Sequence, residues 1–302
     1  MSGGVLAVFG PTASGKTAVA EAIANRIPAE IVSADSMQAY QGLPVLTNQP
    51  DGPTRLVGIW ALDHEGSVGE YAPLAHRAVD DALTAGRTPV VVGGTGLYLR
   101  AALAELAVPP TAPPGARERL ERTYDRLGAD RAHELLAERD PEAAAAVHPH
   151  DRRRVVRALE LHEAGASLRP IDDRLWAADV RHPTAIFGLD VDREVLLGRI
   201  EERIRAMLAF GAREEVRAVL GDRISRTAER VIGLREFAEL EDEEAVAAVM
   251  LRTRRYAAYQ RKWMRRIPGL VSLPADRPPG EIADEILEMA RARQLLPARR
   301  AG

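Results

Sequence analysis

The segment from Gly10 to Thr17 is the feature that most constrains this chain. It reads Gly-Pro-Thr-Ala-Ser-Gly-Lys-Thr, follows the apolar run of residues 5–9 and precedes an amphipathic run of residues 18–27. A strand, a glycine loop and a helix in this order are typical of a phosphate-binding P-loop, whose backbone N–H groups surround phosphate oxygens. The expected phosphate-binding residues are Gly10, Pro11, Thr12, Ala13, Ser14, Gly15, Lys16 and Thr17. We therefore predict that a di- or triphosphate binds here.

Lys16 and Thr17 end this loop and have different expected roles. Lysine occurs only at positions 16 and 262, and arginine supplies the other permanent cations. A lysine ammonium is a compact point charge, which suits a terminal phosphate. The Thr17 hydroxyl occupies the position that holds Mg²⁺ in P-loops, so we predict Thr17 as a metal ligand and Mg²⁺ as the cofactor.

Composition excludes some classes of protein and leaves others open. The chain has 302 residues, no cysteine and a formal net charge of −3. Without cysteine there is no disulfide framework or thiolate metal site. No apolar run reaches membrane length and no leader precedes the first strand, so we expect a cytoplasmic, globular protein that does not bind membranes. The net charge argues against general nucleic-acid coating but allows a local basic surface.

The order of apolar and amphipathic segments predicts an α/β fold. Strand-like runs alternate with helical stretches at first, with strands at 5–9, 30–34, 56–62 and 89–92 and helices at 15–27, 67–85 and 96–106. This alternation indicates a parallel sheet. After the Pro-rich residues 108–116, residues 117–165 carry only helical signals. The sheet then resumes with a strand at 184–190, helices at 192–210, 212–220 and 242–266, and a strand at 270–273.

We therefore predict a P-loop NTPase-like parallel sheet with an inserted all-helical domain. Residues 1–112 would form the first part of the core and residues 113–172 the helical insert. Residues 173–302 would complete the core and be largely helical.

Two strand ends add polar groups to the expected phosphate site. The second strand runs into Ser33-Ala-Asp-Ser-Met-Gln38, at the sheet edge where open α/β folds bind ligands. Asp35 would then face the phosphate, although a role as a simple cap is the alternative. The fourth strand runs into Gly93-Gly-Thr-Gly96, where a nucleotide hydrolase would place an acidic residue. Thr95 is predicted to donate to the same phosphates, although a plain strand-to-helix turn is the alternative.

Two arginine-rich segments indicate a contact with an anion. Asp151 precedes three arginines in the first turn of a predicted helix, where the helix dipole disfavours cations. Residues 252–266 place Tyr256, Tyr259 and Trp263 among further cations. Aromatic and basic side chains together suit RNA, whereas a solvated charged face or an ordinary core stripe would explain the same patterns.

Taken together, these motifs resemble the tRNA dimethylallyltransferases. The resemblance covers residues 5–270 and rests on Gly10–Thr17, Ser33–Gln38 with Tyr40, Gly93–Tyr98, Asp151–Glu160, Val231–Glu236, and Gln260 with Trp263 and Arg265. It implies transfer of the dimethylallyl group from dimethylallyl diphosphate to N6 of the adenosine on the 3′ side of the tRNA anticodon. Mg²⁺ would assist and diphosphate would leave. The P-loop would hold a prenyl diphosphate in place of a nucleotide, so no acid is needed to activate water.

The expected roles follow from the chemistry and from the resemblance. An exocyclic amine is a poor nucleophile, so Asp35 is predicted to accept its proton as general base. Lys16, Thr17 with Mg²⁺ and Thr95 would neutralise the leaving diphosphate. The resemblance implies that Arg117 contacts the reacting groups. It also implies that the tRNA anticodon stem-loop contacts Asp35, Ser36, Met37, Gln38, Arg153, Arg154, Val155, Val156, Arg157, Arg230, Val231, Ile232, Gly233, Leu234 and Arg235. The target base would be flipped out of its stack, and we expect a monomeric enzyme.

The chain departs from the family pattern at pocket-lining or nucleic-acid positions. A usual Gly-Thr-Ala-Lys-Pro reads Leu46-Thr47-Asn48-Gln49-Pro50, and a usual His-His pair reads Thr54-Arg55. A usual Tyr is Leu234, and a usual Lys-Arg pair is Ala258-Tyr259. The resemblance therefore supports catalysis more firmly than tRNA affinity or tRNA choice.

Three other functions share some of these features. They are prenyl transfer to free adenine nucleotides, a small-molecule P-loop kinase and a non-enzymatic RNA-binding protein. The arginine-rich insert argues against the first two. An Asp35 that faces a complete P-loop argues against the third.

Overall fold

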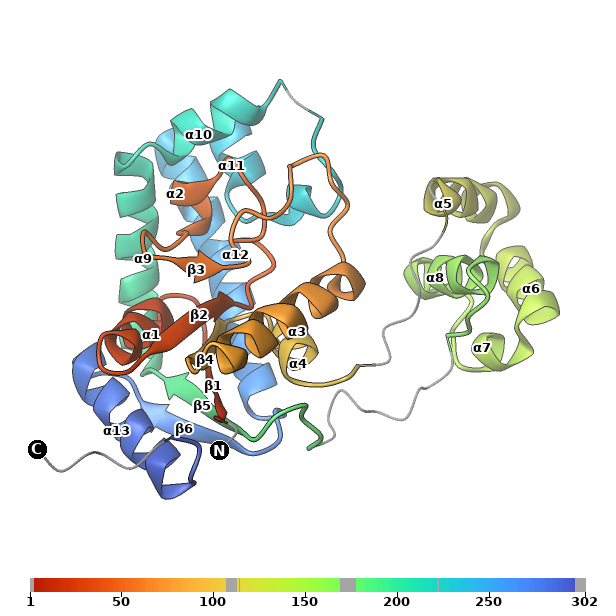
Figure 1. The fold of residues 1–302 in the computed structure, drawn as a ribbon. Coiled ribbons are helices and arrows are strands. Elements are labelled where there is room, and N and C mark those ends of the chain that lie inside the picture. The colour runs from red at the N-terminus through yellow and green to blue at the C-terminus, as the bar shows by residue number, and fades with distance from the viewer. Residues whose placement is uncertain (1–2, 107–112, 114, 169–177, 222, 297–302) are drawn as a thin grey trace, which may run out of the picture. The chain divides into compact units, whose positions relative to one another are not determined.

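The chain divides into two compact units. The computed structural model describes residues 3–106, 113, 115–168, 178–221 and 223–296 (Figure 1). One unit comprises Met1–Glu105 and Ala178–Gly302, and the other comprises Leu106–Ala177. None of the helices within the described ranges is both long and apolar enough to cross a bilayer.

A six-stranded parallel sheet forms the centre of the first unit (Figure 1). Its strands are β1 (Val5–Phe9), β2 (Ala29–Ser33), β3 (Thr54–Arg55), β4 (Thr88–Gly93), β5 (Thr184–Asp190) and β6 (Leu270–Pro274). They lie in the order β3-β2-β4-β1-β5-β6, and every neighbouring pair is parallel. All five residues of β1 are buried, as expected for a central strand covered on both faces. The predicted P-loop NTPase-like parallel sheet is confirmed.

Helices cover both faces of this sheet. The first unit contains α1 (Lys16–Ala24), α2 (Pro44–Thr47), α3 (Val68–Thr84), α4 (Gly96–Leu103), α9 (Arg193–Ala209), α10 (Ala212–Val219), the 3₁₀ turn η2 (Ala228–Arg230), α11 (Leu234–Glu239), α12 (Asp242–Met264) and α13 (Pro279–Ala292). α1 packs with α13 on one face, and α3 packs with α4 on the other (Figure 1). The long helices α9 and α12 pack against each other, and α2, α10 and α11 join them. This group of helices supplies one wall of the pocket described below.

One predicted strand is wrong. Residues 56–62 were expected to form the third strand, but β3 ends at Arg55. Leu56 and Gly58 have positive φ angles, which turn the chain away from the sheet. The later part of the segment contributes only one isolated bridge, between Tyr40 and Trp60.

The second unit is a small helical bundle. Its helices are α5 (Ala116–Leu127), α6 (Ala129–Arg139), α7 (Pro141–Ala145) and α8 (Arg152–Glu163). Leu120 and Tyr124 of α5, Leu136 of α6 and Val155 and Leu159 of α8 meet in its core. Asp151 caps α8 by accepting a hydrogen bond from the Arg154 amide at 3.1 Å.

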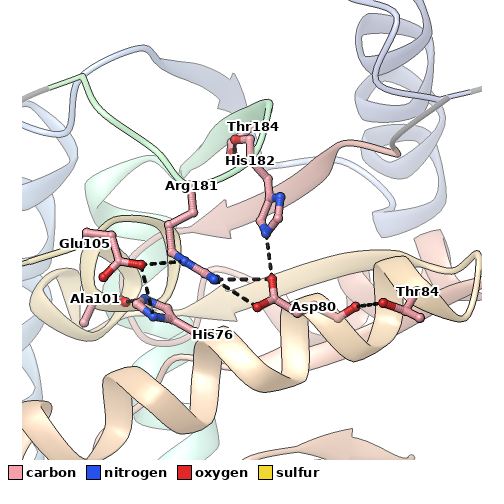
Figure 2. A network of polar contacts seen from close by, with 8 residues as sticks. All are labelled: His76, Asp80, Thr84, Ala101, Glu105, Arg181, His182 and Thr184. Carbon is pink, nitrogen blue, oxygen red and sulfur yellow. Dashed lines mark hydrogen bonds and ion pairs between the residues drawn. The ribbon is translucent and has the colours of Figure 1, made fainter.

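An ionic network holds the first unit together where the chain leaves it and returns to it (Figure 2). Asp80 of α3 accepts hydrogen bonds from Arg181 at 2.9 Å and from His182 at 2.7 Å. Arg181 also donates to Glu105 at 2.9 Å, and its amide donates to the Leu103 carbonyl at 2.8 Å. The hydrogen bond from Arg181 keeps the pKa of Asp80 below its usual range. Both connections are thereby tied to α3.

The turn between β4 and α4 is glycine-rich because other parts of the chain approach it closely. A Cβ atom at Gly93 would overlap the backbone carbonyl of Ala34. At Gly94 it would overlap the Gln260 amide, and at Gly96 it would overlap the Trp263 ring. The glycines therefore let α12 and the segment after β2 lie against this turn. Trp263 is buried, as the core-stripe interpretation predicted.

We predict that Gly93→Ala destabilises the protein by about 1–3 kcal/mol, because the backbone at Ala34 must shift to admit the methyl group. Gly198→Ala is the matched control. Gly198 lies in α9 with open space around its Cα, so the methyl group should stabilise the helix by up to about 1 kcal/mol. Chemical denaturation of both variants measures the difference. Equal effects of the two substitutions would contradict the packing role of Gly93.

Candidate active site

A pocket lies at the carboxyl edge of the sheet, where β1, β2 and β4 end. Its volume is about 850 Å³, which includes the solvent-filled space at its open mouth. Its lining residues are Thr12, Lys16, Thr17, Asp35, Met37, Gln38, Leu46, Thr47, Asn48, Val92, Gly93, Ile200, Arg203, Ile204, Met207, Ile232, Val249, Thr253, Tyr256 and Gln260. The P-loop, the segment after β2 and the helices α9 and α12 therefore face one space.

The P-loop forms one end of this pocket. Ala13 and Gly15 have φ angles of 62° and 88°, and such left-handed residues turn successive N–H groups toward one side. The Lys16 ammonium donates to the Pro11 carbonyl at 2.7 Å. The Ser14 hydroxyl is buried and, among the described residues, meets no hydrogen-bond partner. A cation, the N-terminus of α1 and a buried hydroxyl fit an anion such as a phosphate.

Gln260 of α12 holds the P-loop against the β4 turn. Its Oε1 accepts a hydrogen bond from the Thr12 amide at 2.8 Å, and its Nε2 donates to the Gly94 carbonyl at 3.0 Å. The side chain is 1% exposed, so both bonds are made away from bulk water. An unpaired buried amide would be costly, and these two bonds remove that cost. The resemblance pointed to Gln260, but this bridging role was not foreseen.

Arg203 is a second cation at the P-loop end of the pocket, and sequence reasoning missed it. Its guanidinium donates to the Thr12 hydroxyl at 3.0 Å. Arg203 lies on α9, far from any motif, and α9 as a whole is rich in charged residues. No local signal distinguishes Arg203 from its neighbours; only the packing of α9 beside α12 brings it to the loop.

Asp35 faces the pocket, as predicted. Its Oδ1 accepts a hydrogen bond from the Met37 amide at 3.0 Å, which fixes the carboxylate in a tight turn. Its negative charge acts on Lys16 and Arg203. The carboxylate therefore lies within electrostatic reach of both cations at the P-loop end of the pocket.

Thr95 makes contacts that differ from its predicted role as a phosphate donor. Its hydroxyl lies 3.3 Å from the Ser36 hydroxyl and 3.1 Å from the Tyr256 hydroxyl, and it accepts from the Ser36 amide at 3.3 Å. Burial raises the pKa of Tyr256, so this phenol stays neutral. In these contacts Thr95 connects the turn after β2 to α12. A hydrogen bond from Thr95 to phosphate stays a prediction.

One wall of the pocket is apolar. Ile200, Ile204 and Met207 of α9 form part of it, and Val249 of α12 and Ile232 complete it. The pocket therefore combines a cationic end with an apolar wall, which suits a ligand with an anionic head and a short hydrocarbon tail.

The other residues predicted to contact tRNA in this unit divide into pocket, core and surface positions. Met37 and Gln38 line the pocket, and Ser36 contacts Thr95. Ile232 also lines it, whereas Val231, Gly233 and Leu234 are buried. Arg230 and Arg235 are exposed, and Arg235 donates to Glu229 at 3.0 Å. Of these two segments, Arg230 and Arg235 present exposed side chains, and Met37, Gln38 and Ile232 present side chains to the pocket.

The arginine segment of the helical unit is divided in the same way. Arg153 and Arg154 are exposed, and within the described ranges their side chains make no hydrogen bond or ion pair. Val155 and Val156 are buried in the unit's core. Arg157 pairs with Glu160 at 3.2 Å. Arg117, on α5 of the same unit, pairs with Glu121 at 3.3 Å and with Glu160 at 3.7 Å.

Several departures from the family pattern have identifiable contacts. The Gln49 amide donates to the Gln38 and Tyr40 carbonyls at 3.2 and 2.8 Å, which holds the segment after β2. Arg55 pairs with Glu30 and Asp81. Leu46 lines the pocket, and its amide donates to the Glu215 carboxylate at 2.9 Å. The remaining departures lie at Thr54 in β3, at buried Leu234, and at exposed Ala258 and Tyr259 on α12.

The donors in the pocket suit a metal only together with a phosphate. Among the described residues, no group of three or more His, Asp or Glu could hold an ion by itself. Thr17 and Asp35 supply oxygen atoms at the loop, and phosphate oxygens would complete the hard, oxygen-rich shell that Mg²⁺ requires.

Comparison with known proteins identifies the family. The chain matches the family model described as IPP transferase over residues 38–267 and the one described as isopentenyl transferase over residues 3–53. The tRNA dimethylallyltransferase of Streptomyces coelicolor is 40% identical over 277 residues, which cover 87% of this chain and 88% of that protein. The chain belongs to the tRNA dimethylallyltransferase family.

Other members of the family agree in length and fold. The tRNA dimethylallyltransferase of Thermobifida fusca is 40% identical over 91% of both chains. The tRNA isopentenylpyrophosphate transferase of Bacillus halodurans has a TM-score of 0.68 at 28% identity, covering 96% of this chain and 98% of its own. A eukaryotic dimethylallyltransferase described as acting on tRNA has a TM-score of 0.78 at 25% identity, covering 100% of this chain and 82% of its own. The resemblance drawn from the motifs is thereby confirmed.

The protonation of Lys16 gives a testable property of this family member. Burial lowers the pKa of Lys16 to about 8; Asp35 opposes this shift and Arg203 adds to it. We predict that the affinity for inorganic pyrophosphate falls as the pH rises through about 8, because a neutral amine cannot pair with an anion. Isothermal titration calorimetry between pH 6.5 and 9.5 measures this dependence.

Two variants distinguish the titration of Lys16 from that of pyrophosphate. The ligand ionises in the same way with the parent protein and with both variants, so only a change at Lys16 can move the inflection. Arg203→Gln removes a positive neighbour, so the pKa of Lys16 rises and the inflection moves to higher pH. Asp35→Asn removes a negative neighbour, so the inflection moves to lower pH. An inflection at the same pH in all three proteins would show that Lys16 is not the titrating group.

Proposed function

We propose that this prenyltransferase moves the dimethylallyl group from dimethylallyl diphosphate to N6 of the adenosine on the 3′ side of the tRNA anticodon, and releases diphosphate. The observation that carries the proposal is the two-sided pocket. Its phosphate end holds Lys16, Arg203 and Asp35, and its wall presents Ile200, Ile204 and Met207. A prenyl diphosphate has the matching anionic head and apolar tail. A nucleotide would place a polar sugar against this wall.

The proposed reaction uses Asp35 as the base. N6 of adenine attacks C1 of the dimethylallyl group, and the C1–O bond to the diphosphate breaks. Asp35 accepts the proton that N6 loses, since a carboxylate held by the Met37 amide is already oriented for this step. Lys16, Arg203 and the loop amides neutralise the charge that develops on the leaving diphosphate. Thr95 is proposed to assist them.

We propose Mg²⁺ as the cofactor. Thr17 and the diphosphate oxygens would hold the ion, and when bound it would supply positive charge to the leaving group. The buried, unpaired hydroxyl of Ser14 supports the same site, because it lies in the loop and lacks a partner among the described residues.

The tRNA is proposed to contact both units. In the helical unit, Arg153 and Arg154 are exposed cations without a described partner, which suits RNA phosphates. Arg157 and Arg117 would add further donors. In the other unit, Asp35–Gln38 and the surface arginines Arg230 and Arg235 would contact the anticodon stem-loop. The target base must leave its stack to reach Asp35. We propose a monomer, and the tRNA substrate makes the cytoplasm its expected location.

One assay separates this proposal from the other functions. The protein is incubated with Mg²⁺ and labelled dimethylallyl diphosphate, together with either unmodified tRNA or AMP. We expect label only in the tRNA, at the single adenosine beside the anticodon. Label in AMP would indicate prenyl transfer to free nucleotides. No label in either, with tRNA still bound, would indicate an RNA-binding protein without activity.

Asp35→Asn is expected to reduce the single-turnover transfer rate by roughly 10²- to 10⁴-fold, the usual range for loss of a positioned base. The amide keeps the size of the side chain and can still accept from the Met37 amide, so tRNA and dimethylallyl diphosphate should bind within a few fold of the parent protein. Rapid-quench measurement with both substrates saturating gives the rate. A near-normal rate would leave Asp35 as a structural residue only.

Replacing Arg153 and Arg154 together by Gln is expected to weaken tRNA binding and reduce the salt slope of the binding constant by up to about two counterions. The affinity for dimethylallyl diphosphate should not change. The matched control replaces Arg126 and Arg131, exposed arginines of the same unit, by Gln and removes the same charge. Fluorescence anisotropy at several salt concentrations measures both. If the control lowers the salt slope of tRNA binding by the same amount, the effect comes from the overall charge of the unit and not from Arg153 and Arg154.

A further inference from the structure

Glu160 of α8 is a carboxylate inside the helical unit, and the proposed mechanism does not use it. Its side chain is only 2% exposed, whereas acidic side chains are rarely buried without partners. Glu160 Oε1 lies 3.7 Å from a nitrogen of Arg117, and its Oε2 accepts from Arg157 at 3.2 Å. One carboxylate thus lies between two guanidinium groups that come from different helices.

Both partners are arginines for which a contact with tRNA or the reacting groups is predicted. α5 and α8 pack against each other, which brings both Arg117 and Arg157 to the Glu160 carboxylate. Two cations held this close would repel each other, and the carboxylate offsets that repulsion. On α8, Arg153, Arg157 and Glu160 follow an i, i+4, i+7 spacing and share one face of the helix. Glu160 therefore follows Arg153 and Arg157 along one face of α8, on the C-terminal side of both.

The contacts leave part of each guanidinium available. Arg157 uses Nη1 for Glu160, and Arg117 uses Nε for Glu121 and Nη1 for Glu160. Within the described residues, Nη2 of both side chains and Nε of Arg157 have no partner. An arginine fixed on one side keeps its other donors in a rigid plane, which suits phosphate oxygens.

A gain in stability is a weak explanation for a buried carboxylate paired with two arginines. Replacing a buried ion pair by apolar side chains is often neutral or stabilising, because removing charges from water is costly. Resting on the proposed function, we infer that Glu160 is a positioning residue, which holds Arg117 and Arg157 side by side so that their free donors bind neighbouring phosphates of the tRNA.

Glu160→Gln distinguishes this inference from long-range electrostatics, because the two predict opposite changes in tRNA affinity. Glu160→Gln makes the unit more positive by one charge, so long-range attraction alone predicts tighter tRNA binding. Positioning predicts the opposite, because a neutral amide no longer holds both guanidiniums. We expect the KM for tRNA to rise roughly tenfold, the size typical of coupled contacts, while the KM for dimethylallyl diphosphate changes less than about twofold.

Glu163→Gln is the matched control. Glu163 lies on the same helix and pairs with Arg119 and Arg139, which have no proposed role in binding. This variant removes the same charge, so its KM for tRNA should stay the same or fall. Thermal unfolding of both variants shows whether the bundle is intact.

A double-mutant cycle distinguishes positioning from a general structural effect. In a background with Arg117→Gln and Arg157→Gln, Glu160→Gln should change tRNA binding by less than about twofold, because Glu160 then has nothing to hold. The same loss in both backgrounds would overturn the inference, and so would unchanged or tighter binding by Glu160→Gln alone. If that variant does not fold, Glu160→Asp keeps the charge but withdraws it from the arginines, and the same outcomes decide.

The proposed function can fail separately. If the parent protein transfers no label to tRNA, the proposed function is wrong. If it does, and the cycle is additive, only the role of Glu160 is wrong.

Discussion

The buried amide of Gln260 is the contact on which the geometry of the pocket depends. It bonds the P-loop at Thr12 and the β4 turn at Gly94, and it lies on α12. Since a buried amide is costly unless both its donor and its acceptor are bonded, these two bonds favour the observed register of α12. The glycines of the β4 turn make room for that docking. With α12 fixed, α9 packs beside it and carries Arg203 to the loop.

The charges at the loop follow from this arrangement. Lys16 and Arg203 are both partly withdrawn from water, which lowers the pKa of each, and Asp35 compensates part of that cost. Such a site is favourable for a diphosphate, which restores the missing negative charge. The same two helices supply the apolar wall. The packing of α9 against α12 therefore determines both where the anionic head of a ligand would bind and where its tail would lie. Prenyl transfer, the proposed role of this P-loop, does not require the acidic residue that a nucleotide hydrolase needs.

The sequence predicted whatever depends on local pattern. The P-loop, Asp35 and most strands could be found because each lies in or beside a short apolar run that is followed by an amphipathic or polar segment. Residues 56–62 were misplaced because an apolar run does not reveal the positive φ angle of Leu56. Arg203 was missed because its role depends on contact with Thr12, 191 positions away in the chain. Thr95 was located correctly at the sheet edge, but its contacts with Ser36 and Tyr256 required the fold.

A prenyl diphosphate is the ligand that we propose for this P-loop. Calorimetric titration with dimethylallyl diphosphate, inorganic pyrophosphate and ATP, each with Mg²⁺, tests this proposal most directly. Burial of the five-carbon tail against Ile200, Ile204 and Met207 should make dimethylallyl diphosphate bind at least about tenfold more tightly than pyrophosphate, since each buried CH₂ contributes about 0.8 kcal/mol. ATP should bind more weakly than dimethylallyl diphosphate. Tighter binding of ATP, or equal affinity for pyrophosphate and the prenyl compound, would contradict the account.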